Sequence, residues 1–263
     1  MRKSFRPKKS LGQHFLHDLK VLAQIVHFIA PQFSDSLVEI GPGTGTLTTK
    51  LLPLVNSMEV IEIDRLIIPK LKQQCKNREN LHIYIADVLS MDFAQLGAPL
   101  RLVGNLPYNI STPLLFKTIE NIDLIQDLHF MVQKEVAERI AALPGTKNYG
   151  RLSVMLQYYY TIELLCYVGP RAFFPPPKVS SAFIRLVPRK YHAVQDKKLF
   201  KEIVQTTFGQ RRKMLANSLK KLAPITQLVK IGIDPTLRPE QLTVDDFILL
   251  SNKLSSQTRL TIT

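Results

Sequence analysis

The chain has 263 residues, is 45% hydrophobic and carries a formal net charge of +14. This length and composition predict a folded protein of one or two domains, and no apolar run approaches the roughly 18 residues that cross a membrane. Cys75 and Cys166 stand alone and the histidines are scattered, so we expect neither a disulfide framework nor a metal site. No apolar signal segment follows the basic first ten residues, and we therefore expect a cytoplasmic protein.

The positive charge is concentrated at the two ends of the chain. Residues 1–20 hold six Lys and Arg against one acid, and residues 188–263 hold fourteen against six, whereas the long middle is nearly neutral. A phosphate backbone would bind such basic segments, so the distribution favours a nucleic-acid partner. The alternative is a solvated surface that only keeps the protein in solution.

A glycine-rich turn follows the first predicted strand. An apolar-periodic helix, N-capped by Asp18 and ending at Ile29, precedes that strand, which spans residues 37–40. The glycines stand at alternate positions and allow polar groups of a ligand to approach the backbone closely: Gly41, Gly43 and Gly45. Their spacing is G-x-G-x-G, with Glu39 two residues before the first, a pattern that favours S-adenosylmethionine over a dinucleotide. A purely structural turn is the alternative interpretation.

Acidic residues end the next two predicted strands. The second strand, at 58–63, carries Glu62 at the distance from the glycine turn that suits a carboxylate binding ribose hydroxyls. Asp64 is an alternative for that role, although its position favours a helix N-cap. The third strand, at 81–86, leads to Asp87, which we expect to face the adenine amino group of the cofactor; a solvated turn is the alternative.

Strands alternate with helices through the first part of the chain. A fourth strand at 100–104 and a fifth at 127–133, followed by a helix at 134–143, complete a pattern typical of an α/β fold with a doubly wound parallel sheet. Two further strands, at 161–168 and 180–187, are expected to form an antiparallel pair at the edge of this sheet.

The strand pattern stops near residue 188. Residues 195–263 show helical periodicity, turn signals and many basic residues, which predict a small helical domain. We therefore expect two domains, a cofactor-binding domain at 1–188 with a basic tail and a helical RNA-binding domain at 189–263. Arg212 and Lys220 are spaced to share one helix face, and further cations lie close to them in the sequence: Arg211, Lys213 and Lys221.

The tetrapeptide Asn105-Leu106-Pro107-Tyr108 follows the fourth predicted strand. Methylation of an exocyclic amine requires acceptors that hold the NH₂ group with its lone pair directed at the methyl donor. The Asn105 side-chain carbonyl and the Leu106 backbone carbonyl can accept these hydrogen bonds. Pro107 stiffens the turn, and Tyr108 offers a ring face on which a base can stack. An ordinary turn is the alternative interpretation.

Six motifs, in order along the chain, point to one family. They are Gly12-Gln13-His14-Phe15-Leu16, Glu39 to Gly45, Asn105 to Ser111, Tyr149 to Val154, Phe173 to Val179 and Phe208 to Lys213. Through these motifs the chain resembles the bacterial small-subunit ribosomal RNA adenine dimethyltransferases of the KsgA type. The resemblance implies a Rossmann-like class I methyltransferase domain followed by a small C-terminal helical domain. It also implies transfer of four methyl groups from S-adenosylmethionine to N6 of two adjacent adenosines, in a hairpin near the 3′ end of 16S rRNA, during assembly of the 30S subunit.

The resemblance also implies roles for individual residues. The cofactor would be contacted by His14, Leu16, Gly41, Glu62, Asp87 and Asn105. The target base would be held by Asn105, Leu106 and Tyr108, with Phe173 stacked on the flipped adenine. The implied partner is 16S rRNA in pre-30S particles, and we expect the protein to act as a monomer.

Three residues depart from what is common in this family: His14 in place of Asn, Arg171 in place of a small residue and Ser180 in place of Asp. The first leaves open the hydrogen bond made at that position, and the other two indicate an adjusted loop around the target base.

Two other functions fit parts of the sequence. A related enzyme that dimethylates 23S rRNA shares the frame of the tetrapeptide, although the segments 109–112 and 208–213 favour the 16S enzyme. A non-catalytic assembly factor would use the same fold only to bind pre-30S particles. The intact Asn105 and Tyr108 argue against that alternative.

Overall fold

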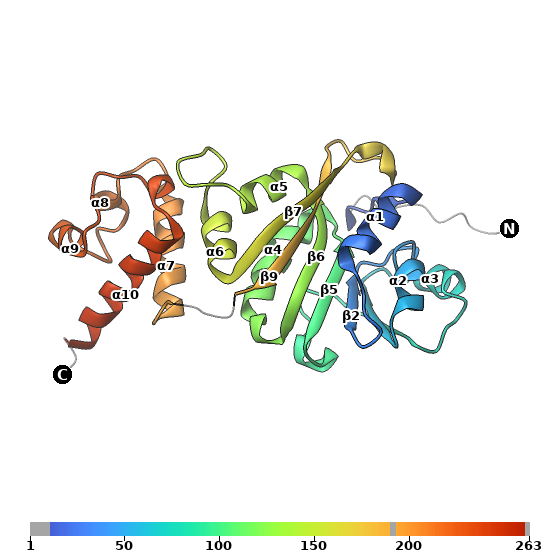
Figure 1. Ribbon diagram of the computed structural model, residues 1–263. Helices are drawn as coiled ribbons and strands as arrows, with labels where there is room; N and C mark the ends of the chain where they lie inside the picture. The colour runs from blue at the N-terminus through green and yellow to red at the C-terminus, as the bar shows by residue number, and fades with distance from the viewer. Residues whose placement is uncertain (1–10, 190–192, 261–263) are drawn as a thin grey trace. The chain divides into compact units, whose positions relative to one another are not determined.

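The computed structural model describes residues 11–189 and 193–260, which form two compact units (Figure 1). The first unit comprises residues 1–137 and 161–188, and the second comprises residues 138–160 and 189–263. The sequence-based division at residue 188 assigns residues 138–160 to the first domain, whereas in the structure they group with the C-terminal helices. None of the helices in the described residues combines the length and the apolar composition needed to cross a bilayer.

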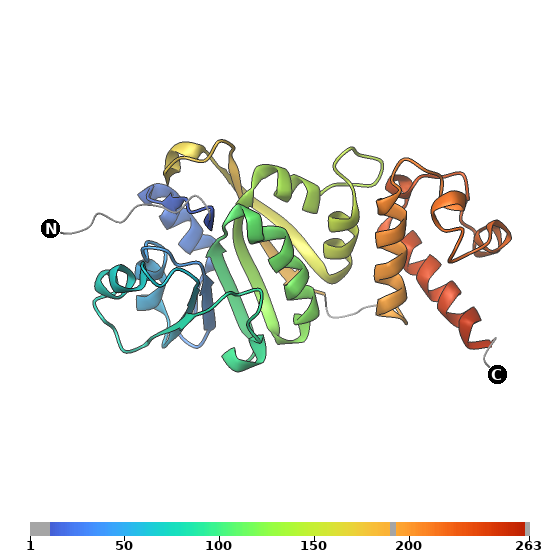
Figure 2. The ribbon, with the colours of Figure 1, turned by 180° about the vertical axis from the view of Figure 1, so that it is seen from behind.

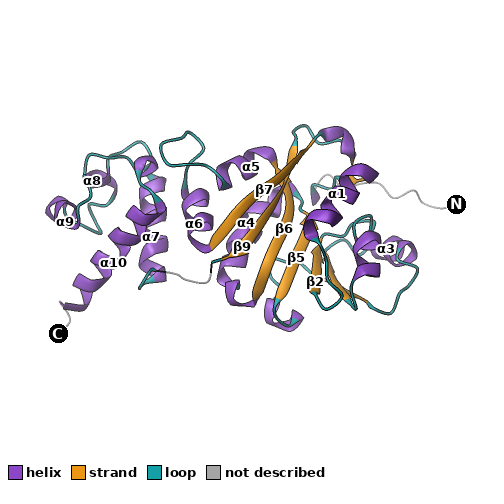
Figure 3. Ribbon diagram, viewed as in Figure 1, coloured by secondary structure: helices purple, strands orange, loops and turns teal. Residues whose placement is uncertain are grey.

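A seven-stranded sheet forms the centre of the first unit (Figure 3). Its strands are β2 (Ser36–Ile40), β3 (Met58–Glu62), β4 (Leu81–Ile85), β5 (Leu100–Asn105), β6 (Ile125–Gln133), β7 (Tyr160–Val168) and β9 (Ser181–Pro188). The order across the sheet is β4-β3-β2-β5-β6-β9-β7, and the pairs from β4 to β6 are parallel. β9 runs antiparallel to β6. The predicted doubly wound α/β fold is confirmed, and the last two predicted strands are neighbours at one edge.

Helices cover both faces of this sheet. They are α1 (Leu19–Ile29), α2 (Thr48–Leu51), α3 (Ile68–Gln74), α4 (Tyr108–Glu120) and α5 (Lys134–Ile140), with 3₁₀ turns at Leu52–Leu54, Phe93–Leu96, Ile122–Leu124 and Pro170–Ala172. The first three share one apolar core with the sheet, to which Leu22 of α1, Leu71 of α3 and Val103 of β5 all belong. α4 lies over the opposite face, which is turned to the viewer in Figure 2.

Helix α1 is fixed at both ends. The predicted N-cap is confirmed, because the Asp18 carboxylate accepts hydrogen bonds from two backbone N–H groups of the first turn. At the other end, Arg101 of β5 donates to the Ile29 carbonyl at 2.7 Å. The same guanidinium holds Asp127 of β6 through two bonds of 3.0 and 2.9 Å. A buried cation needs such partners, so this network sets the position of α1 on the sheet.

A second, two-stranded sheet joins the N-terminal segment to the loop between β7 and β9. β1 (Phe15–Leu16) pairs antiparallel with β8 (Phe173–Phe174), Phe15 opposite Phe174 and Leu16 opposite Phe173. The sequence predicts only a stiff connection here, because two-residue strands have no periodicity to detect. The pairing places the Gly12–Leu16 motif beside the Phe173–Val179 motif.

The second unit is helical, as predicted. Its helices are α6 (Arg151–Tyr159), α7 (Lys197–Gly209), α8 (Leu215–Ser218), α9 (Ile225–Ile231) and α10 (Val244–Leu260), with a 3₁₀ turn at Pro239–Gln241. Aromatic contacts explain why α6 belongs to this unit. The rings of Tyr158 and Phe200 lie 4.6 Å apart, and those of Tyr149 and Phe208 lie 6.1 Å apart.

The predicted basic stripe on one helix is wrong. α8 has only four residues, and Arg212 and Lys220 lie in the exposed turns before and after it. Arg211 is held within the unit, since its Nε donates to Glu240 at 2.6 Å and its Nη2 donates to the Lys147 carbonyl at 2.7 Å. The helical spacing in the sequence is interrupted by turns that the periodicity does not reveal.

Candidate active site

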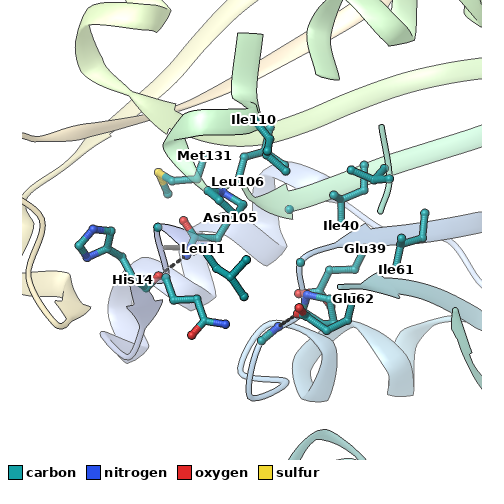
Figure 4. A pocket seen from close by; sticks show the side chains of 18 of the residues that line it. Leu11, His14, Glu39, Ile40, Ile61, Glu62, Asn105, Leu106, Ile110 and Met131 are labelled. Atoms are coloured by element: carbon teal, nitrogen blue, oxygen red, sulfur yellow. Dashed lines mark hydrogen bonds between the residues drawn. The ribbon is translucent and has the colours of Figure 1, made fainter. Parts of the chain in front are cut away.

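A pocket of the first unit lies at the carboxyl ends of the parallel strands, where open α/β sheets bind ligands (Figure 4). Ten of the predicted site residues line it: His14, Leu16, Gly41, Gly43, Glu62, Asp87, Asn105, Leu106, Pro107 and Tyr108. Gly45 and Phe173 do not. The topology thus brings residues that are up to 94 positions apart in the sequence to one cavity, with β2, β3, β4 and β5 each contributing at its end.

The glycine turn has the backbone geometry that the spacing predicts. Gly41 and Gly43 have φ angles of +67° and +53°, and a Cβ on Gly43 would lie 2.7 Å from the ring of Phe15. Gly45 also has a positive φ, but a Cβ there would meet Leu71 at 2.7 Å. Gly45 therefore allows α3 to pack against the turn, and it is not part of the pocket lining.

Glu62 is held in place by the glycine turn. Its carboxylate accepts hydrogen bonds from the backbone N–H of Gly43 at 3.1 Å and of Asp64 at 2.9 Å. Burial raises the pKa of Glu62, and these two N–H donors act against that rise. Asp64, the alternative, lies outside the lining and accepts from Gln13 Nε2 at 3.1 Å and from the backbone N–H of Leu66. The predicted N-cap role is also wrong, since α3 begins only at Ile68.

Glu39 is a second buried carboxyl group in the lining, beyond those assigned to the site from the sequence. Burial raises the pKa of Glu39 to about 7. The Thr48 hydroxyl donates a hydrogen bond of 2.6 Å to the carboxylate, which opposes this rise. The signal was present in the sequence, because an acid stands two residues before Gly41. The pocket lining therefore includes two buried acidic groups, Glu39 and Glu62, that a cationic ligand would stabilise in their charged form.

Asp87 lies two residues after the end of β4, is exposed and lines the pocket. One of its carboxylate oxygens, Oδ1, accepts a hydrogen bond from the backbone N–H of Leu89 at 2.9 Å. The turn thereby fixes the side chain while leaving its other oxygen to a ligand.

The Asn105–Tyr108 tetrapeptide links β5 to α4. Asn105 Nδ2 donates to the backbone carbonyl of His14 at 2.7 Å, the bond drawn in Figure 4. The Leu106 N–H donates to the Met131 carbonyl of β6 at 3.1 Å, and Pro107 occupies the N-cap position of α4 without a side-chain capping bond. These bonds orient the Asn105 side chain and leave its Oδ1 as an acceptor for a ligand.

Tyr108 and His14 connect the tetrapeptide to the two-stranded sheet. The Tyr108 hydroxyl lies 2.8 Å from Ser181 Oγ, and burial raises the pKa of this phenol. The ring of His14 is 5.6 Å from that of Tyr108, and its Nδ1 lies 2.6 Å from the Pro175 carbonyl. The imidazole at this position therefore joins the N-terminal motif to the loop after β8.

Phe173 is not placed to stack on a base in this arrangement. Its side chain is 2% exposed and belongs to the core shared with Leu16 and Phe183. Successive side chains of a strand point to opposite faces, so the next residue, Phe174, is the exposed one, at 63%. The motif identifies the loop but does not show which of the two rings faces inward.

Gly104 is a lining residue that the sequence analysis missed. A Cβ on it would lie 2.5 Å from the carbonyl oxygen of Ile40, so only glycine allows β5 to approach β2 this closely. Its position directly before the tetrapeptide was the available signal. Among the described residues no cluster of three or more His, Cys, Asp or Glu could hold a metal ion.

Comparisons with known proteins match nearly the whole chain. The family model "Ribosomal RNA adenine dimethylase" matches residues 4–256. Two proteins named "Ribosomal RNA small subunit methyltransferase A", from Chromobacterium violaceum and Pseudomonas fluorescens, are 49% and 48% identical, over 94% and 96% of this chain and 95% of each relative. A dimethyladenosine transferase structure from Plasmodium falciparum matches with a TM-score of 0.81 and 28% identity, covering 94% of this chain and 98% of that one. The 23S rRNA methyltransferase ErmE matches with a TM-score of 0.72 and 25% identity, covering 92% and 99%. The chain belongs to the ribosomal RNA adenine dimethylase family.

Proposed function

We propose that this protein transfers methyl groups from S-adenosylmethionine to N6 of two adjacent adenosines near the 3′ end of 16S rRNA. The orientation of the Asn105 side chain is the strongest support for this function. At the end of β5, its amide donates to the His14 carbonyl, so its acceptor oxygen is available in the pocket. The near-50% identity to small-subunit methyltransferases over most of the chain supports 16S rRNA as the substrate.

The lining residues fit S-adenosylmethionine, which supplies an electrophilic methyl group on a positively charged sulfur when bound. Glu62 can accept hydrogen bonds from ribose hydroxyls, and Asp87 can accept from the adenine amino group. Gly41 and Gly43 line the pocket without a Cβ, so their backbone can approach the amino-acid part closely. The acidic Glu39 favours a ligand that carries positive charge.

The tetrapeptide would hold the target amine. Asn105 Oδ1 accepts one N6 hydrogen and the Leu106 carbonyl accepts the other, which directs the nitrogen lone pair away from the ring plane and toward the bound methyl donor. Tyr108 supports the base by stacking, and its hydroxyl is kept in place by Ser181. The proton released by the amine after methylation passes to water, so no side chain with a strongly perturbed pKa is required.

The partner is 16S rRNA in pre-30S particles, bound by a monomer in the cytoplasm. The exposed cations around α8 support an RNA-binding role for the helical unit, because phosphate contacts supply most of the affinity for nucleic acids: Arg212, Lys213, Lys220 and Lys221.

Primer extension on 16S rRNA from a deletion strain tests the proposal. N6,N6-dimethyladenosine blocks the extending enzyme, so a stop near the 3′ end should be absent in the deletion strain and return with this protein. The Asn105→Ala variant should bind particles without restoring the stop. Restoration of the stop by that variant would contradict the assigned chemistry.

A stop that appears in 23S rRNA instead would favour the function named for ErmE, whose structure is similar to this one. Binding of particles by the parent protein, with no methylation of either RNA, would favour the non-catalytic assembly factor.

A further inference from the structure

The loop between β7 and β9 exposes an aromatic ring beside the pocket. Phe174 is 63% exposed, although a large apolar side chain gains free energy from burial. It pairs across the two-stranded sheet with Phe15, and the carbonyl of the next residue, Pro175, lies 2.6 Å from the His14 ring. Because Phe15 and His14 both line the pocket, Phe174 lies close to its rim.

The chain segment that contains Phe174 is positively charged. The sequence has no acidic residue between Glu163 and Asp196. Within that stretch, Arg171 and Lys178 lie on either side of Phe174 along the chain, and both are exposed. An exposed ring that is flanked along the chain by two exposed cations is a combination suited to single-stranded nucleic acid, since bases stack on the ring while phosphates attract the cations.

We propose that Arg171, Phe174 and Lys178 form a rim that binds the nucleotide next to the target adenosine. The inference rests on the proposed function and extends it to the recognition of the neighbouring base. Phe174 stacks on that base while the target adenine occupies the pocket, and the two cations contact the adjoining phosphates. This arrangement would position the second of two adjacent adenosines while the first is methylated.

A stacking experiment tests the rim. The probe is an RNA hairpin with two adjacent unpaired adenosines, one of them replaced by 2-aminopurine, whose fluorescence falls when it stacks on an aromatic ring. The variants are Phe174→Ala, the conservative Phe174→Tyr, and the control Phe33→Ala, which removes a ring that is 69% exposed before the amino end of β2.

Phe174→Ala should weaken RNA binding about tenfold and abolish the quenching, without changing the affinity for S-adenosylmethionine. Phe174→Tyr and Phe33→Ala should behave as the parent. The slope of log affinity against log salt is negative, and replacing Arg171 and Lys178 together by Ala should reduce its magnitude by about 1.4.

Two failures can be told apart. If the parent methylates the RNA but Phe174→Ala binds and quenches like Phe33→Ala, the rim is overturned and the proposed function stands. If the parent neither binds nor methylates the hairpin or 30S particles, the proposed function is overturned together with the rim.

Discussion

The side-chain amide of Asn105 donates a 2.7 Å hydrogen bond to the backbone carbonyl of His14. The bond joins an N-terminal motif to the end of β5 across 91 positions of sequence, and it fixes which end of the Asn105 amide faces the pocket. An acceptor is thereby oriented before any substrate binds, which lowers the cost of orienting the amine.

Replacing Asn105 by Asp should separate orientation from binding. The carboxylate keeps an acceptor but loses the donor to His14, so turnover should fall at least about 100-fold while RNA affinity changes little. Single-turnover methylation and filter binding measure the two quantities. Asn80→Asp is the matched control, because Asn80 Nδ2 also donates to a backbone carbonyl, that of Asn56 at 3.0 Å, but lies outside the pocket. Equal losses of turnover and RNA affinity would contradict the assignment.

Glu62 should determine cofactor affinity. Glu62→Ala is expected to weaken S-adenosylmethionine binding by about 1.5–3 kcal/mol, since it removes hydrogen bonds to a charged acceptor. Calorimetry measures the change. Glu59→Ala on the same strand, outside the lining, is the control and should leave the affinity unchanged. An unaltered affinity in Glu62→Ala would remove this residue from the site.

Glu39 should make stability depend on pH. Its pKa is about 7 in the folded protein, whereas the ordinary value of a glutamate side chain is 4.5, so between these values the folded state retains a proton that the unfolded state releases. The free energy of unfolding of the parent, relative to Glu39→Gln, should therefore fall by up to about 3 kcal/mol as pH rises from 4.5 to 7, and then stay level. Urea unfolding of both proteins at several pH values gives this difference. A difference that does not vary with pH would show that Glu39 titrates normally.

Substitutions of Phe173 and Phe174 should have very different effects on the stability of the protein. Phe173→Ala empties part of the core and should cost about 3–5 kcal/mol of unfolding free energy. Phe174→Ala removes an exposed ring and should change stability by less than about 0.5 kcal/mol. Thermal and urea unfolding of the two variants make the comparison, and a small effect of Phe173→Ala would indicate that its ring leaves the core.

The helical unit should carry part of the salt dependence of RNA binding. Reversing Arg212 and Lys220 to Glu is expected to weaken particle binding and to flatten its dependence on salt, with S-adenosylmethionine affinity unchanged. The same reversal at Lys72 and Arg78, exposed cations of the first unit, is the control. If log affinity falls with log salt at the same slope in the parent and in the Arg212/Lys220 variant, the phosphate contacts lie elsewhere in the protein.

The sequence predicts the central sheet and most of the pocket because both depend on local patterns. Apolar runs that end in Gly41, Glu62, Asp87 and Asn105 mark strand ends, and parallel topology brings those ends together. The β1–β8 pairing was not predicted, since it depends on contacts between distant two-residue segments. For the same reason the sequence does not distinguish the buried Phe173 from the exposed Phe174.

The predicted basic stripe is wrong because helix boundaries cannot be predicted from residue spacing alone. A spacing of eight residues fits one helix face only if the helix continues, and here turns flank the four residues of α8. The length of a helix depends on its packing within the unit, and the residue periodicity of a short segment does not reveal that packing.

The most direct test of the account is mass spectrometry of 16S rRNA from 30S particles that lack the modification, after incubation with the purified protein and S-adenosylmethionine. We expect four added methyl groups, as N6,N6-dimethyladenosine at two adjacent positions of the 3′-terminal fragment, and none with Asn105→Ala. Methylation at any other position, or none with the parent protein, would contradict it.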